Sequence, residues 1–252
     1  MKYLTVLFLL SLGTVHAQIA DYFTTEFLLG GKLNSENLIA DYKGYDFSRI
    51  WTKTENSNVY GVIGEDHQRL RLKLITVEKN PFDSTEYIIY GKSMVKNTIC
   101  DFTGVIRINE VRTFNEFHFG VDNEYEQAGI KSQGILIGAY EFRENRDQVH
   151  SGVFKGELSA RWYLNKDDQM FYDDIQLATD GYVNNAFIGV WRSYSSNNEK
   201  LCNWGDYRVP MANEGFDIGA AELSVSDKYR DKGWEDTGSE NTLLNMRVKW
   251  WE

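Results

Sequence analysis

The stretch Gly134–Leu164, GILIGAYEFRENRDQVHSGVFKGELSARWYL, decides the fold of this chain. It contains two arms in which every second residue is apolar or small: Gly134, Leu136, Gly138, Tyr140 and Phe142, then Phe154, Gly156, Leu158, Ala160, Trp162 and Leu164. Polar residues such as Glu141, Arg143, Lys155 and Glu157 occupy the alternate positions. Alternation of this length is typical of strands with one face in an apolar interior and the other in water. The stretch therefore predicts two long strands folded back on each other.

Shorter strand patterns recur on both sides of this hairpin, separated by turn sequences such as Asn80-Pro81. They cover Val59–Ile63, Arg69–Val77, Glu86–Met94, Thr98–Val111, Gln169–Ile175, Ala186–Tyr194 and Leu201–Val209. We expect an all-β fold, an antiparallel up-and-down meander of about 8–10 strands closed as a barrel. A short C-terminal helix is predicted over Ser226–Gly233, with Ser226 as its N-cap.

The N-terminus has the pattern of a secretory signal peptide. One positive charge at Lys2 precedes an apolar run, Tyr3–Leu12, and small residues lead to a candidate cleavage site after Ala17. The run is shorter than the roughly 20 residues needed to span a bilayer, and no later stretch is apolar enough to be a transmembrane segment. We expect a signal peptide over 1–17, export to the periplasm or the medium, an N-terminal extension over 18–58 that wraps or plugs the barrel, a meander over 59–210 and a C-terminal extension over 211–252.

Charge and cysteine content narrow the possible partners. The formal net charge is −10, and so acidic a surface repels nucleic acid. In an oxidising compartment a disulfide between Cys100 and Cys202 is plausible, the alternative being two separate buried thiols. Two cysteines and the scattered His67, His118 and His150 do not form a metal-ligand pattern, and no cofactor-binding motif occurs.

One short pattern suggests a relationship. Gly189-Val190-Trp191 is followed by Arg208, and this combination resembles the calycin barrels, the lipocalins and their relatives. In that family a glycine-x-tryptophan closes the bottom of the barrel and an arginine from a late strand stacks on the indole. The resemblance implies a lipocalin-like barrel.

Aromatic residues on the inward faces are the candidate ligand contacts. A later segment rich in Trp, Tyr and Arg adds further candidates. The full set is Tyr140, Phe142, Phe154, Trp162, Trp191, Trp204 and Arg208. Glycines beside the rings leave room for a small apolar or aromatic ligand, or the rings fill a packed core instead.

Three classes of function fit these patterns. The first is an exported barrel that binds a small, partly apolar ligand in its interior or at its mouth. The second is a hydrolase acting on extracellular glycans or lipids, which needs two carboxylates on one concave face. The sequence offers Glu141 with Glu157, Asp173 with Asp174, and Asp167 with Asp168, but no catalytic motif. The third is a structural or interaction protein of the cell envelope, acting through its acidic surface and aromatic tail. Oligomeric state has no signal in the sequence.

Overall fold

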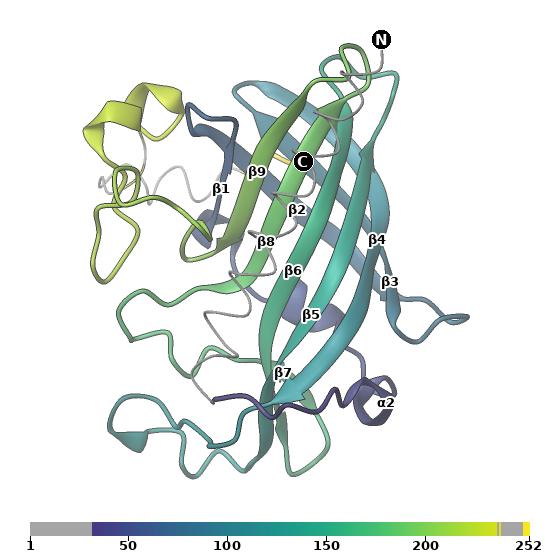
Figure 1. The fold of residues 1–252 in the computed structure, drawn as a ribbon, viewed down its shortest axis with the longest axis vertical. Helices are drawn as coiled ribbons and strands as arrows, with labels where there is room; N and C mark the ends of the chain where they lie inside the picture. The colour runs from purple at the N-terminus through teal and green to yellow at the C-terminus, as the bar shows by residue number, and fades with distance from the viewer. Residues whose placement is uncertain (1–31, 236, 238–248) are drawn as a thin grey trace, which may run out of the picture.

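The computed structural model describes residues 32–235, 237 and 249–252, and these form one antiparallel sheet with short helices around it (Figure 1). The strands are β1 (Val59–Ile63), β2 (Gln68–Lys79), β3 (Glu86–Val95), β4 (Thr98–Thr113), β5 (Ile130–Glu144), β6 (Gly152–Asn165), β7 (Met170–Tyr172), β8 (Asn184–Ser193) and β9 (Glu199–Asp206). The helices are α2 (Ile39–Tyr42) and the 3-10 helices η2 (Ser48–Trp51), η3 (Asn56–Asn58), η4 (Val121–Asn123) and η5 (Asp227–Lys232). The predicted all-β fold with a short C-terminal helix is confirmed.

Eight of the strands close into a ring. Around the ring the order is β1, β2, β3, β4, β5, β6, β8 and β9, and β9 pairs with β1 to complete it. The short β7 pairs only with the end of β6, outside the ring. Every pairing is antiparallel, so the hairpin turns after β1, β3, β5 and β8 all lie at one end of the barrel. We call this end the mouth.

The middle of the barrel is packed with aromatic rings. Phe187 and Trp204 stack at 4.7 Å between centroids, and Tyr140 meets both rings edge-on. The glycines beside them admit these rings: Gly156 lies opposite Gly189, and a Cβ on Gly189 would lie 2.6 Å from the Tyr140 hydroxyl. Edge-to-face and offset contacts of this kind are favourable, and together they fill this layer of the interior.

The end opposite the mouth is closed by the segment before β1. Phe47, Ile50 and Trp51 are buried in the same core as the barrel, with Phe47 against Trp162 and Trp51 edge-on to Tyr87. Of the two roles predicted for the N-terminal extension, its described part therefore includes a plug.

A buried carboxylate ties this plug to the barrel. Asp206 accepts hydrogen bonds from the hydroxyls of Thr54 (2.8 Å) and Tyr172 (3.0 Å) and from Asn185 Nδ2 (2.7 Å), which also donates to the Ile50 carbonyl. Burial raises the pKa of Asp206 to about 7, although the three hydrogen bonds oppose the rise.

The chain after β9 packs on the outside of the barrel. Val209, Phe216, Tyr229 and Trp234 form a second apolar cluster, against which Tyr60 and Val62 of β1 pack. The predicted helix is η5; Gly233 ends it with a left-handed backbone, φ +92°, whereas the Ser226 side chain makes no capping hydrogen bond. At the C-terminus Trp250 donates to Asn56, and the Lys73 ammonium lies over the Trp251 ring.

The predicted disulfide between Cys100 and Cys202 is absent, and both residues are buried free thiols. Cys100 lies on β4 and Cys202 on β9, which are four steps apart in either direction around the eight-stranded ring. The two strands face each other across the filled interior, whereas a disulfide needs Cα atoms about 4.4–6.8 Å apart. Sequence spacing could not reveal this separation.

Within residues 32–235, 237 and 249–252, no helix has the length and apolar character needed to cross a membrane. The same residues contain no group of three or more His, Cys, Asp or Glu side chains that could hold a metal ion.

Candidate functional site

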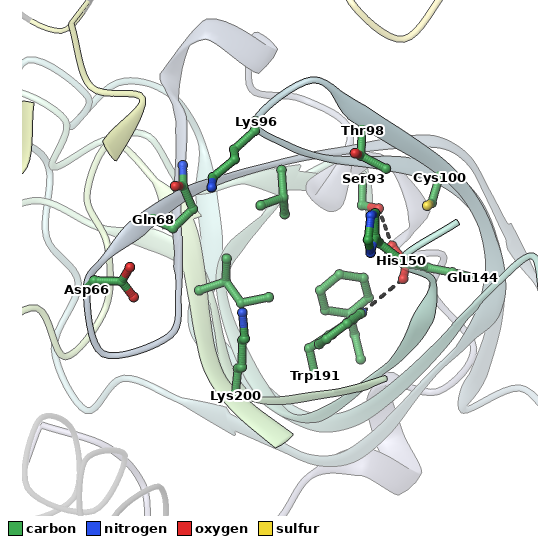
Figure 2. A pocket seen from close by; sticks show the side chains of 13 residues that line it. Asp66, Gln68, Ser93, Lys96, Thr98, Cys100, Glu144, His150, Trp191 and Lys200 are labelled. Atoms are coloured by element: carbon green, nitrogen blue, oxygen red, sulfur yellow. Dashed lines mark hydrogen bonds between the residues drawn. The ribbon is translucent and has the colours of Figure 1, made fainter. Parts of the chain in front are cut away.

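A cavity of about 360 Å³ lies at the mouth of the barrel, above the packed aromatic layer (Figure 2). Its apolar wall consists of Ile63, Val95, Phe154 and Trp191. Its polar wall consists of Asp66, Gln68, Ser93, Lys96, Thr98, Cys100, Glu144, His150 and Lys200. The cavity therefore combines a ring-bearing apolar surface with many hydrogen-bonding groups.

Glu144 is the most unusual group in this wall. It is the last residue of β5 and continues the inward series of Tyr140 and Phe142, so its carboxylate enters the barrel instead of facing water. Only 5% of the residue is exposed. Charged groups are almost never buried so deeply without partners, because desolvation is costly.

Three donors from three different strands satisfy the Glu144 carboxylate. The Ser93 hydroxyl on β3 donates to one oxygen, while the Gly152 backbone N–H on β6 (2.7 Å) and Trp191 Nε1 on β8 (2.9 Å) donate to the other. Burial raises the pKa of the Glu144 carboxyl above its usual range, and the three hydrogen bonds oppose that rise. A carboxylate offers about four lone-pair positions, so one more donor can be accepted.

The thiol of Cys100 also lines the cavity, beside Glu144. Burial, together with the nearby Glu144 and Asp101 carboxylates, raises the pKa of this thiol to about 11. Since the thiolate is the nucleophilic form, Cys100 is a neutral wall group at physiological pH and not an activated nucleophile.

Two lysines lie at the rim of the cavity. Lys96 lies in the turn between β3 and β4, where its backbone has φ +55°, and Lys200 lies on β9 directly opposite Trp191 of β8. In Figure 2 both side chains lie on one side of the opening, while Ser93, Glu144 and His150 lie on the other.

Six of the seven predicted ligand contacts lie within the barrel, at different depths. Only Phe154 and Trp191 reach the cavity. Tyr140, Phe142 and Trp204 belong to the packed layer beneath it, and Trp162 lies at the closed end against Tyr42 and Phe47. The buried members, Tyr140, Phe142, Phe154, Trp162 and Trp204, are at most 3% exposed.

Arg208 lies outside the barrel, past the closed end of β9. It pairs with Asp217 (2.9 Å) and donates to the carbonyls of Gly219, Ala220 and Glu222. Trp191 is at the mouth, so the two residues that suggested a calycin relationship lie at opposite ends of the barrel. That resemblance therefore depends on the barrel meander and stays a prediction.

The carboxylate pairs predicted for a hydrolase do not reach the cavity. Glu141 is on the outer face with Arg143 and Lys155, and Asp168 is in an exposed turn with Lys131. Asp173 is buried beside His118, whose Nε2 lies 3.0 Å from the carboxylate, at the closed end.

The groups that sequence reasoning missed could have been found by extending the alternation. Glu144 is two residues beyond Phe142, Ser93 is two beyond Gly91, and Lys200 shares the parity of Cys202 and Trp204. Their convergence on one cavity could not be found this way, because it depends on pairing between strands distant in sequence.

Comparisons of the chain with models of known families, with curated proteins and with solved structures find no match. The chemistry of the cavity therefore carries the functional interpretation. An aromatic wall can cover an apolar body, and the convergent polar groups can orient a polar end.

Proposed function

We propose that this protein is exported and binds a small, partly apolar ligand in the cavity at the mouth of its barrel. The observation that carries the proposal is the contrast between a filled level and a hollow level of the same barrel interior. Below Phe154 aromatic rings fill the space, whereas above it about 360 Å³ is left hollow between apolar and polar groups. Packed cores contain few voids larger than a water molecule, and small-molecule sites occupy roughly 300–1,000 Å³.

Blocking the cavity tests this proposal. Thr98→Trp places an indole at the cavity wall, and the matched control Thr103→Trp places one on the outward face of the same strand. Binding of a fluorescent apolar probe, 8-anilinonaphthalene-1-sulfonate, should be lost in the first variant and retained in the second. Equal binding by both variants, with both folded by circular dichroism, would contradict a site at the mouth.

Export has its own test. The predicted signal peptide, residues 1–17, lies outside the described residues, so the support for export is its sequence pattern. When the full-length chain is expressed in a host with an export pathway, intact-mass analysis should find a mature protein beginning at Gln18 outside the cytoplasm. Recovery of the uncleaved chain in the cytoplasm alone would argue against export.

A hydrolase is a second candidate because Glu144 and Asp66 line the same cavity. A buried carboxyl with a raised pKa is a frequent feature of catalytic acids. In this alternative Glu144 would donate a proton to a leaving group and Asp66 would be the second carboxylate. Release of reducing sugar or fatty acid from a substrate panel, abolished by Glu144→Gln and by Asp66→Asn, would favour the hydrolase over the binding protein.

A further inference from the structure

We infer that the ligand of the mouth cavity carries an anionic group, which Lys96 and Lys200 hold at the rim while its apolar body lies against Phe154 and Trp191. This inference depends on the proposed function, since it specifies the chemistry of the ligand in that same cavity. It also assigns an orientation, with the charge outward and the apolar part inward.

The two lysines combine a place in the cavity lining with the absence of an ion pair. Several basic side chains elsewhere pair with carboxylates, as Arg107 does with Glu86, Arg192 with Glu199 and Arg230 with Asp227. Lys96 and Lys200, by contrast, form no ion pair with any residue in the described part of the chain, although both line the cavity. In a chain with a net charge of −10, two ammonium groups on one side of the opening give that side a local excess of positive charge.

The carboxylate of Glu144 favours the same orientation. Glu144 lies on the side opposite the lysines, and its carboxylate accepts hydrogen bonds from Ser93, Gly152 and Trp191. An anion pushed toward Glu144 would meet like charge in a poorly solvated wall, which is unfavourable. Asp66 is exposed in the turn after β1 and lies on the lysine side of the opening in Figure 2, where the two ammonium groups outnumber its single carboxylate.

The apolar part of the ligand would then lie against the aromatic wall of the cavity. Phe154 and Trp191 present rings to the cavity, with Ile63 and Val95 beside them. The indole of Trp191 is fixed by its bond to Glu144, so it offers a preorganised flat surface. An amphiphile with a single negative head group matches this layout, whereas a cationic amphiphile would place its charge beside the lysines.

Two fluorescent probes that differ only by a sulfonate test the inference: 8-anilinonaphthalene-1-sulfonate and the neutral N-phenyl-1-naphthylamine. In the full-length protein we expect the sulfonate probe to bind about tenfold more tightly at low salt, since each exposed ion pair contributes up to about a fivefold effect. The preference should shrink as salt is raised, because salt screens exposed charges.

The variant Lys96→Gln/Lys200→Gln should weaken binding of the sulfonate probe to the level of the neutral probe and leave the neutral probe unchanged. The control Lys131→Gln/Lys155→Gln removes the same charge from ion pairs outside the cavity and should keep the preference. Equal affinity of the two probes in the wild-type chain, or a preference that survives loss of Lys96 and Lys200, would overturn the anionic inference and leave the proposed function standing. Binding of neither probe would count against the proposed function itself.

Discussion

The indole Nε1 of Trp191 donates a hydrogen bond of 2.9 Å to the buried carboxylate of Glu144. The two residues lie on β8 and β5, which are not neighbours in the sheet, because β6 separates them. The bond therefore spans the inside of the barrel wall. It fixes an aromatic surface and a carboxylate in the same cavity, which makes Glu144 both a structural link and part of the candidate site.

Glu144→Gln should destabilise the protein by about 1–3 kcal/mol, because the neutral amide oxygen accepts weaker hydrogen bonds from Gly152 and Trp191 and the N–H₂ replaces the oxygen to which Ser93 donates. Urea unfolding followed by circular dichroism would measure the loss. Glu141→Gln is the matched control on the outer face of the same strand, and its effect should stay within about 0.5 kcal/mol. Equal stability of the two variants would show that the three hydrogen bonds to Glu144 are not formed as described.

Asp206 predicts a pH dependence at the closed end. Burial raises its pKa to about 7 in the folded chain, against an ordinary value of 3.8. Between about pH 4 and pH 7 the folded chain keeps a proton that the unfolded chain has lost, so this group's contribution to stability falls as pH rises and is lost above about pH 7. Where the two states differ by one full proton, the slope is about −1.4 kcal/mol per pH unit.

The neutral analogue Asp206→Asn isolates this contribution from the other carboxylates. Unfolding free energies of the two proteins, measured from pH 4 to pH 8, should show the wild type losing stability relative to Asp206→Asn as pH rises. A constant difference across the range would mean that Asp206 is charged in the folded chain throughout.

Much of the fold could be predicted because the strands follow one simple rule. Alternation of apolar and polar residues gave Val59–Ile63 for β1 without error and Arg69–Val77 for β2, which extends from Gln68 to Lys79. The parity of Tyr140, Phe142, Phe154 and Trp162 also indicated correctly that these rings face inward. Period-2 patterns are local, so they can be recognised without any three-dimensional information.

The cysteines give a chemical prediction. In the folded protein at pH 8, thiol reagents should react slowly, because both thiols are buried and burial raises the pKa of Cys100 to about 11. After denaturation without reductant, two thiols per chain should react, and a reductant should leave the melting temperature unchanged. Finding no reactive thiol in the unfolded, unreduced chain would indicate that Cys100 and Cys202 form a disulfide after all.

Gly156 predicts a steric effect inside the sheet. A Cβ at this position would lie 2.1 Å from the carbonyl oxygen of Ile188 and 2.7 Å from the Cα of Gly189, so backbone would have to move. Gly156→Ala should therefore cost roughly 1–3 kcal/mol. Gly44→Ala, where no atom lies within 4 Å of the added Cβ, should be nearly neutral, and thermal unfolding of both variants measures the contrast. Similar melting temperatures for the two would contradict the close approach of β6 and β8.

The site was harder to predict than the fold because it depends on pairings that no local pattern contains. Glu144 collects donors from Ser93, Gly152 and Trp191, and two of these are about fifty residues away along the chain. Whether Gly156 and Gly189 leave an empty space or admit a ring depends on how Tyr140 packs over the neighbouring strands β6 and β8. The position of Cys100 relative to Cys202 likewise follows from the closure of the strands into a barrel and not from the number of residues between them.

The resonance of the Trp191 indole N–H tests the central claim most directly. In a two-dimensional proton–nitrogen spectrum the signal is assigned by its loss in Trp191→Phe, and 8-anilinonaphthalene-1-sulfonate is then titrated into the wild-type protein. We predict a saturable shift of this signal with the same dissociation constant as the fluorescence of the probe. Saturable binding that leaves the Trp191 signal unmoved would contradict a ligand site at the mouth of the barrel.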